Sequence, residues 1–316
     1  MPARLDIIIV NWNTGGELRA CLDSIVGAGR GPFDIDRVVV VDNASSDGSC
    51  DALAHPALRL HVIRNRENRG FAAACNQGAA GSRADYLLFL NPDTRLAPDS
   101  LSRPVAFMEE ETARSVGICG VRLVDDRGDT TTSCARFPTL RTFFANASGL
   151  SRLRPRRWPS HLMTADECRE TRDVDQVIGA FFLIRRHLFE VLGGFDQRFF
   201  VYFEEVDLSL RVRQRGYRSV LLADVTAYHR GGASSDQVRA VRLFYSLRSR
   251  LLYAFKHYSA LEAALLVAVT VGLELPSRVA LALARRSLTD VKETLQAYMM
   301  LTAYFGQRAI GRTADV

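Results

Sequence analysis

An apolar run ends in polar residues at LFLNPDT, residues 88–94, the first place where the sequence could support chemistry. The run predicts a buried strand, and Pro92 ends it because proline cannot donate a hydrogen bond to a sheet. Asn, Pro and Asp all favour turns, so a simple turn explains the stretch as well as a site does. In a site, Asp93 would supply a carboxylate, and oxygen atoms are the ligands that Mg²⁺ and Mn²⁺ prefer.

A second group of carboxylates lies in YFEEVDLSLRVRQRG, residues 202–216. Its apolar residues alternate as in a strand, but acids first, arginines last and a final glycine indicate a helix. In a helix Glu205 points about 100° away from Glu204, so the acids do not converge on one atom. Asp207 can pair with Arg211 four residues later. The aromatic residues before the acids favour a partly dry pocket that raises a carboxylate pKa; otherwise the acids only complement the helix dipole.

Four polar clusters follow predicted strands in the first half of the chain. The short apolar runs are residues 5–10, 37–41, 58–63 and 86–90. Helix-like segments lie between them, including 16–28, 71–81 and a turn with a helix start after Asp42. This alternation predicts a mostly parallel sheet with helices on both faces, in which ligands bind beyond the carboxyl ends of the strands. The clusters expected along that edge are 11–13, 42–43, 64–70 and 91–93.

The remainder of the 316-residue chain is more varied. Residues 121–177 are less regular and contain RLRPRRWP, which is either a solvated loop or, alternatively, a mobile lid or a phosphate contact. Residues 177–186 return to a strand pattern, and 238–312 are helical throughout. We therefore expect an α/β domain over residues 1–235 and a C-terminal helical region over 236–316, within the usual size range of domains.

Composition narrows the classes of protein. With 47% hydrophobic and 24% charged residues the chain is an ordinary globular one. Its net charge is +6, and 39 of its 41 basic residues are arginine. Arginine binds phosphate bidentately, which favours an anionic partner, but the base composition of the genome gives the same bias and is the preferred explanation. The six cysteines form no CxxC pair, which argues against a zinc site or a disulfide framework. The apolar run at the N-terminus is too short for a signal peptide, so we expect a cytoplasmic protein.

The segment 260–286 is apolar but interrupted by Glu262, Glu274 and Pro276. Its longest uncharged stretch is about 11 residues, short of the roughly 20 that span a bilayer. Two interpretations remain: a buried helix pair, or peripheral contact of residues 260–286 with the inner face of the cell membrane. Nearby cations that suit the second interpretation are Arg278, Arg285 and Arg286.

The order of the motifs resembles that of family 2 glycosyltransferases, most of all their bacterial rhamnosyltransferase-like members. The motifs are IIIVNWNTGGELRACLDSI, VVVVDNASSDGS, NRGFAAACNQG, LFLNPDT, GAFFLIRR, GGFDQRFFVYFEEVDLSLRVRQRGY and AYHRGGAS. The resemblance covers roughly residues 5–235. It implies a GT-A fold with a Rossmann-like sheet, a nucleotide-sugar donor, Mg²⁺ or Mn²⁺, and inversion at the anomeric carbon.

The resemblance also assigns a metal edge. The family's DxD motif is NPD here, so Asp93 is implied as the principal carboxylate ligand, and Asn91 can offer a neutral oxygen to the ribose or the metal. His229 matches a position where related enzymes place a metal or diphosphate ligand, although a lone histidine is more often structural. A cation bridging the phosphates lowers the barrier because the leaving diphosphate gains charge as the bond breaks.

The nucleotide pocket is implied in the same way. Asp42 would accept a hydrogen bond from a pyrimidine N3–H, or belong only to a capping turn, and Asn13 would lie near the base or ribose. The other residues expected along this pocket are Asn11, Asn43, Asn68, Gly70 and Asn76. Gly70 allows close approach of the backbone.

The acidic pair of the family corresponds to Glu204 and Glu205, with Glu205 as the base that takes the proton of the acceptor hydroxyl. We therefore expect an inverting, metal-dependent transferase that moves rhamnose from dTDP-rhamnose, or else a sugar from a UDP-sugar. The acceptor would be a cell-surface glycan or a lipid-linked oligosaccharide, and no nucleic acid partner is expected.

Two alternatives remain. A nucleotidyltransferase would need a basic Gly-rich loop near the N-terminus, and NWNTGGEL has no Lys or Arg. A non-catalytic glycan-binding protein would not need the intact Asp93 and Glu205. No GxGxxG follows the first strand, which weakens a dinucleotide-binding interpretation.

Overall fold

The computed structural model describes residues 2–29, 31–231 and 239–309. The chain divides into two compact units. Unit 1 consists of Met1–Phe137, Leu162–Phe200 and Glu204–Ser234, and unit 2 of Pro138–His161, Val201–Phe203 and Ser235–Val316. The sequence placed all of residues 1–235 in one domain, whereas the structure assigns two stretches of that range to the helical unit.

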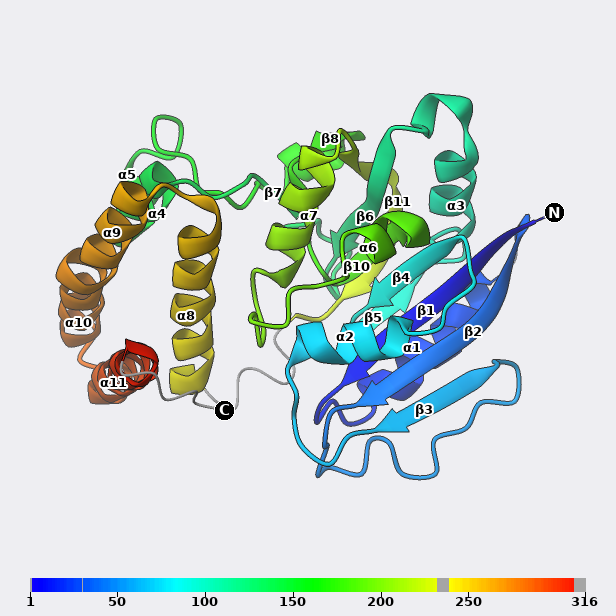
Figure 1. Cartoon of the computed structure of the whole chain (residues 1–316), viewed down its shortest axis with the longest axis horizontal. Coiled ribbons are helices and arrows are strands. Elements are labelled where there is room, and N and C mark those ends of the chain that lie inside the picture. Colours follow the sequence, from blue (N-terminus) through cyan, green and yellow to red (C-terminus); the bar gives the residue numbers. More distant parts are fainter. Residues whose placement is uncertain (1, 30, 232–238, 310–316) are drawn as a thin grey trace. The chain divides into compact units, whose positions relative to one another are not determined.

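Unit 1 is built on a large sheet with strand order β3-β2-β1-β4-β10-β6-β11-β5, and β8 pairs with β11 (Figure 1). Neighbouring strands among β1 to β4 are parallel, as are β6 and β11. β10 runs antiparallel between β4 and β6. The predicted mostly parallel sheet is therefore confirmed, with β10 reversed inside it.

The strands of this sheet are β1 (Ala3–Asn11), β2 (Phe33–Asp42), β3 (Leu60–Arg64), β4 (Tyr86–Leu90), β5 (Thr94–Leu96), β6 (Val116–Val124), β8 (Arg172–Val174), β10 (Phe181–Arg185) and β11 (Arg218–His229). A separate ladder joins β7 (Cys134–Ala135) to β9 (Gln176–Val177). Short 3₁₀ turns lie at η1 (Glu111–Ala113) and η2 (Glu167–Arg169).

Helices cover both faces of the sheet because the central strands are apolar on both sides. In β1, Ile7 and Ile9 pack toward α1 (Glu17–Ala28) and α3 (Ser102–Glu109). Ile8 lies on the opposite face with α2 (Phe71–Ala79), α6 (Arg186–Val191) and α7 (Glu204–Gln214). Side chains alternate across a strand, so one continuous apolar run can serve both layers.

The helix start expected after Asp42 does not form. The segment between β2 and β3 is a loop with turns, because its polar side chains bond to the loop backbone instead of capping a helix. Ser45 N donates to Asp42 Oδ1 at 3.3 Å, and Ser49 N donates to Asp47 Oδ1 at 3.0 Å. The other oxygen of Asp47 accepts from Gly15 N at 2.8 Å, which ties this loop to the one after β1.

The alternating segment after residue 203 is helical, as its end signals predicted. Asp207 is fully buried, and its Oδ2 accepts from Arg211 Nε at 2.8 Å, so the predicted pair is confirmed. Arg211 also donates to the carbonyls of Leu192 and Gly194, each at 2.8 Å. The pair therefore fixes α7 to the turn that follows α6.

Unit 2 is helical, as the C-terminal sequence predicted. Its elements are α4 (Leu140–Ala147), α5 (Leu150–Leu153), α8 (Arg239–His257), α9 (Ala260–Ala268), the π-helical η3 (Val269–Glu274), α10 (Leu275–Ala284) and α11 (Leu288–Ala309). Phe244, Leu247 and Leu251 of α8 form its core with Leu266 and Leu301.

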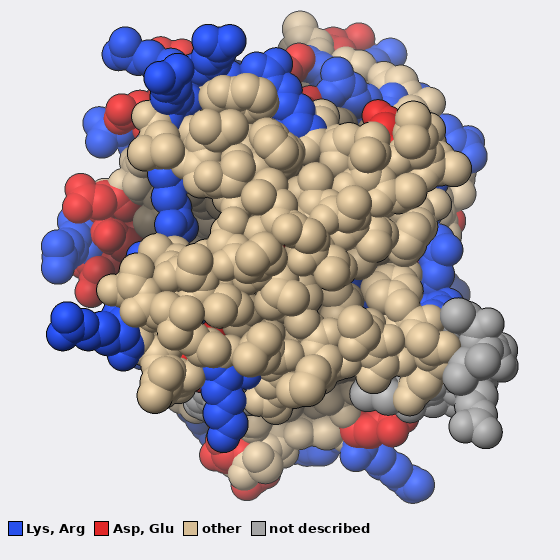
Figure 2. Space-filling view, turned by 90° about the vertical axis from the view of Figure 1, so that its left-hand side faces the viewer, with Lys and Arg blue, Asp and Glu red and all other residues tan. Residues whose placement is uncertain are grey.

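The segment expected as a buried pair or a membrane contact is one continuous helix from Ala260 to Ala284 with a π turn before Pro276. By length and composition it could cross a membrane, and only 17% of its most apolar window is buried. The buried helix pair is therefore wrong for the described residues. Figure 2 shows a broad uncharged face on the side of the molecule where α9, α10 and α11 lie in Figure 1.

Gly70 is a position where the fold depends on the absence of a side chain. Its φ is +82°, and a Cβ would lie 2.5 Å from the carbonyl oxygen of Phe200. We expect Gly70→Ala to lower the free energy of unfolding by about 3 kcal/mol or more, since strain and a backbone clash add. Gly81→Ala is the matched control, with a φ of +67° and open space around it; it should cost about 1 kcal/mol. If urea unfolding gave equal losses of the free energy of unfolding for Gly70→Ala and Gly81→Ala, the steric constraint at Gly70 would be contradicted.

Candidate functional site

The register of the parallel strands brings the predicted polar clusters to one edge of the sheet. Asn11 is paired with Asp42, and Asp42 with Arg64. Leu90, the last residue of β4, is paired with Ile9 two residues before the end of β1. The segments after these strands therefore leave the sheet side by side, at the carboxyl edge where α/β proteins bind ligands.

Asn11 is fully buried and holds the loop after β2 in place. Its Nδ2 donates to Ser49 Oγ at 2.8 Å, to Ser45 Oγ at 2.9 Å and more weakly to Asp42 Oδ1 at 3.4 Å. Its Oδ1 accepts from the hydroxyl of Thr14. Asn11 thus uses both ends of its amide inside the protein and positions Asp42, which is 7% exposed.

Asn13 joins the same two loops from the other side. Its φ of 51° is left-handed, a conformation that asparagine tolerates better than most residues. Its backbone N–H donates to Ser45 Oγ at 3.1 Å, and its Oδ1 accepts from Ser46 N at 2.8 Å. Asn13 and Asp42 therefore both contact Ser45 and lie on the same part of the edge.

Asn43 organises the loop before α2. Its Nδ2 donates to Asn68 Oδ1 at 2.7 Å and to the carbonyl of Gly70 at 3.3 Å, and its Oδ1 accepts from Arg69 N at 3.1 Å. Asn68 Oδ1 also accepts from Gly70 N at 3.0 Å. These bonds hold the loop against the end of β2. They also place Gly70 beside Phe200, whose backbone carbonyl accepts a hydrogen bond from Phe71 N at 2.6 Å.

Asn76 is placed differently from the other residues expected in the nucleotide pocket. Its Nδ2 donates to the carbonyl of Phe195 at 2.8 Å, and its Oδ1 accepts from Phe195 N at 2.9 Å. The amide is thus occupied by the turn after α6, and the geometry gives Asn76 the role of fixing that turn to α2.

Asn91, Asp93 and His229 come together at the end of β4. His229 is the last residue of β11 and is paired with Thr94 of β5. The Nε2 atom of His229 lies 3.4 Å from both Asp93 Oδ1 and Asn91 Nδ2. Thr94 N donates to the carbonyl of Asn91 at 3.1 Å, so the stretch forms a turn and a polar cluster at once.

The donor atoms of Asp93 and His229 fit one divalent cation. Their separation of 3.4 Å is near the roughly 3 Å between adjacent ligands of an octahedral ion with bonds of about 2.1 Å. Within residues 2–29, 31–231 and 239–309, no group of three or more His, Cys, Asp or Glu side chains could hold a metal. Mg²⁺ and Mn²⁺ commonly take remaining ligands from phosphates and water, so two protein donors are sufficient in such a site.

The two glutamates at the start of α7 have unlike surroundings. Glu204 is 5% exposed, and its Oε2 has no hydrogen-bond partner among the described residues. Burial, and then the charge of Glu205, raise the pKa of Glu204 well above the usual range of a glutamate. Glu205 is half-buried. The pair can therefore carry a proton on Glu204.

Sequence reasoning missed several residues that shape this edge. Thr14, Ser45 and Ser49 surround Asn11, and only the serine-rich turn after β2 hinted at them. Phe200 contacts the loop before α2 through its backbone carbonyl, and no local signal in the sequence indicates this contact.

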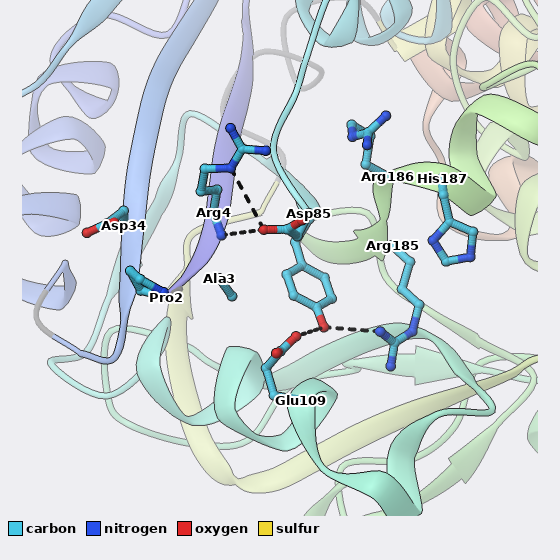
Figure 3. A pocket seen from close by; sticks show the side chains of 10 residues that line it. Pro2, Ala3, Arg4, Asp34, Asp85, Glu109, Arg185, Arg186 and His187 are labelled. Atoms are coloured by element: carbon cyan, nitrogen blue, oxygen red, sulfur yellow. Dashed lines mark hydrogen bonds and ion pairs between the residues drawn. The ribbon is translucent and has the colours of Figure 1, made fainter.

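A cavity of about 740 Å³ lies at the opposite edge of the sheet (Figure 3). The Tyr86 hydroxyl donates to Glu109 Oε1 and accepts from Arg185 Nη1 at 3.1 Å. Arg185 also donates to the carbonyls of Met108 at 2.7 Å and Val116 at 2.8 Å. These bonds connect Arg185 and Tyr86 to α3 and the start of β6.

The sequence model of the family described as "Glycosyl transferase family 2" matches residues 6–193. The N-acetylglucosaminyl-diphospho-decaprenol L-rhamnosyltransferase of Mycobacterium tuberculosis (strain H37Rv) is 25% identical over 272 residues, which cover 81% of this chain and 85% of that protein. The rhamnosyltransferase WbbL of Escherichia coli K12 is 31% identical over 145 residues, covering 46% of this chain and 51% of WbbL.

Solved structures agree in fold. The mannosyltransferase PcManGT from Pyrobaculum calidifontis, in complex with GDP-Man and Mn²⁺, has a TM-score of 0.55 at 20% identity, covering 100% of this chain and 88% of that chain. S. aureus TarS 1–349 with UDP-GlcNAc has a TM-score of 0.52 at 13% identity, covering 94% and 92%. Both similarities support the α/β fold of GT-A type.

The raised pKa of Glu204 predicts a pH-dependent stability. The folded protein holds a proton that the unfolded chain releases, so this group's contribution is full below about pH 4.3 and is lost as pH rises toward the folded pKa. Glu204→Gln removes the dependence. We expect the stability of the variant relative to the wild type to rise as the pH increases above about 4.3, by at most about 1.4 kcal/mol per pH unit, measured by urea unfolding.

The exposed Glu67→Gln is the control, and its difference from the wild type should stay flat over the same range. A flat difference for Glu204→Gln as well would contradict the assignment of a raised pKa to this residue.

Proposed function

Because the chain belongs to glycosyl transferase family 2 and is a glycosyltransferase, we propose that it is an inverting, metal-dependent rhamnosyltransferase. The donor is dTDP-rhamnose, with a UDP-sugar as the second candidate. The observation that carries the proposal is the cluster of Asp93 and His229, 3.4 Å apart, on the same sheet edge as Asp42. The rhamnosyltransferases among the relatives support the choice of sugar.

In this proposal Asp42 and Asn13 bind the base. Asp42 is nearly buried at the end of β2, where its carboxylate accepts the N3–H that both thymine and uracil carry. Adenine has no such N–H on its ring, so the carboxylate disfavours adenine, whereas guanine carries a comparable N1–H; the choice of a pyrimidine in this proposal follows the rhamnosyltransferase relatives. Asn11, Asn43 and Asn68 act on the nucleotide indirectly, because their amides hold the loops that form the pocket.

Asp93 and His229 would hold Mg²⁺ or Mn²⁺, and the amide of Asn91 beside His229 helps to orient the imidazole. The bound cation would neutralise the charge that develops on the leaving diphosphate. The Mn²⁺ in the PcManGT complex supports a divalent cation for this fold. With two protein donors, the site leaves ligand positions for the diphosphate of the donor.

Glu205 is the proposed base. It takes the proton of the acceptor hydroxyl while that oxygen bonds to the anomeric carbon, and the bond from this carbon to the diphosphate oxygen breaks on the opposite face. Glu204 keeps its own proton, which leaves a single negative charge at the pair. The nucleoside diphosphate leaves with the electron pair of the broken bond.

The acceptor in this proposal is a sugar on a polyprenyl diphosphate. The support comes from the mycobacterial relative, whose name states an N-acetylglucosaminyl-diphospho-decaprenol acceptor. That relative is matched over most of both chains, so the likeness extends beyond the donor half of the fold. The reaction would take place in the cytoplasm, where nucleotide sugars are available.

A thermal-shift panel with dTDP, UDP and GDP, each with and without Mn²⁺, tests the donor and the metal together. We expect dTDP and UDP to raise the Tm more than GDP, and Mn²⁺ to increase the shift, because a ligand stabilises the folded state by mass action. Asp93→Ala should lose the Mn²⁺-dependent increment and keep the rest. The exposed Asp99→Ala is the control. Equal shifts in the two variants would refute the metal assignment.

Substitution of the acidic pair tests the base. Glu205→Gln should lower kcat for transfer by about 10²–10⁴-fold while the nucleotide-induced Tm shift persists, since a general base contributes about that much. Glu204→Gln should lose less, because the amide resembles the protonated acid. A larger loss of kcat in Glu204→Gln than in Glu205→Gln would instead assign the role of base to Glu204.

A further inference from the structure

Unit 2 exposes an uncharged face on four consecutive elements, α9, η3, α10 and α11. On the helix from Ala260 to Ala284 the exposed fractions are 70% for Leu261, 45% for Leu265 and 55% for Leu283. On α11 they are 77% for Leu288 and 63% for Met299. Figure 2 shows this face as a broad uncharged surface with most charged residues at its border. Soluble proteins rarely expose so wide an apolar surface unless it binds something.

The opposite side of the same helix is held by buried polar contacts. Glu274 is 6% exposed and lies 2.6 Å from Arg250 Nη2 of α8 and 2.8 Å from Arg278 Nη2. Arg250 also donates to Thr270 Oγ1 at 3.0 Å, and the carbonyl of Thr270 accepts from Tyr298 of α11 at 3.0 Å. To cross a bilayer, the helix would have to break these ion pairs or carry them into hydrocarbon.

The charge of unit 2 indicates an anionic partner. The described residues of unit 2 include 15 Lys and Arg but only four Asp and Glu. The net charge of the whole chain is +6, so the positive charge is concentrated in unit 2. Residues 138–161 contribute five arginines and no acid. Exposed arginines lie in and after α5 and at the end of α10; they are Arg152, Arg154, Arg156, Arg157, Arg285 and Arg286.

We propose that the face formed by α9, η3, α10 and α11 docks on an anionic phospholipid bilayer, and that residues 260–284 lie along that surface without crossing it. An apolar helix face on a strongly basic unit is the pattern of helices that rest in the headgroup region. A second copy of this chain would bring two strongly basic units together, which disfavours self-association. The inference goes beyond the proposed reaction, since lipid binding requires neither donor nor metal.

Flotation of the purified full chain with vesicles tests the proposal. We expect the protein to float with vesicles of phosphatidylcholine and phosphatidylglycerol, to float less with phosphatidylcholine alone, and to be released by high salt and by alkaline carbonate. The triple variant Leu261→Asn/Leu265→Asn/Leu283→Asn should lower the partition coefficient about tenfold or more. Arg285→Ala/Arg286→Ala should weaken the preference for the anionic vesicles.

The control is Val191→Asn, an exposed apolar residue of unit 1 that is 63% accessible; it should float like the wild type. Each variant should keep the nucleotide-induced Tm shift, which separates this test from the proposed function. Three results would overturn the proposal: wild type that does not float, a triple variant that floats unchanged, or retention after carbonate. A dimer that the triple variant turns into a monomer, seen by light scattering, would assign the face to self-association instead.

Discussion

The buried amide of Asn11 connects the end of β1 to the loop after β2, and the candidate site depends on that connection. Its Nδ2 bonds to two serine hydroxyls of the loop, and its backbone carbonyl accepts from Asn43 N at 2.8 Å. A buried amide without partners costs about 1–3 kcal/mol, so this loop has little freedom to move away. The placement of Asp42, Asn13 and the loop before α2 all follow from it.

The proposed reaction uses two groups of charged side chains in unit 1, and their electrostatic environments differ. At the end of β4, the donor atoms of Asp93 and His229 lie 3.4 Å apart in a nearly buried cluster. At the start of α7, burial raises the pKa of one of two adjacent carboxyls. If cation and donor share ligands as proposed, each increases the affinity of the other by the same factor, because binding linkage is reciprocal.

Local patterns in the sequence predicted the elements that follow local physics. The apolar runs predicted β1 to β4, and the acid-first, arginine-last order predicted α7 and the Asp207–Arg211 pair. The loop after Asp42 was mispredicted because its side chains bond to its own backbone. Contacts between distant residues, such as Asn76 with Phe195 and Asn91 with His229, have no local signal. His229 was found from motif order rather than from a physical pattern.

The backbone pairing at the two ends of residues 138–161 has an evolutionary consequence. Residues 138–161, which belong to unit 2, leave unit 1 after Phe137 and return at Leu162, and Leu162 is bridged to Ala135. The two ends of this insertion are thus held together by backbone pairing. Asn91 N donates to the carbonyl of Ala180 at 3.0 Å, again through the backbone. Descendants of such a chain could lengthen, shorten or exchange the inserted helices while the strand ends that carry Asp93 stay in register.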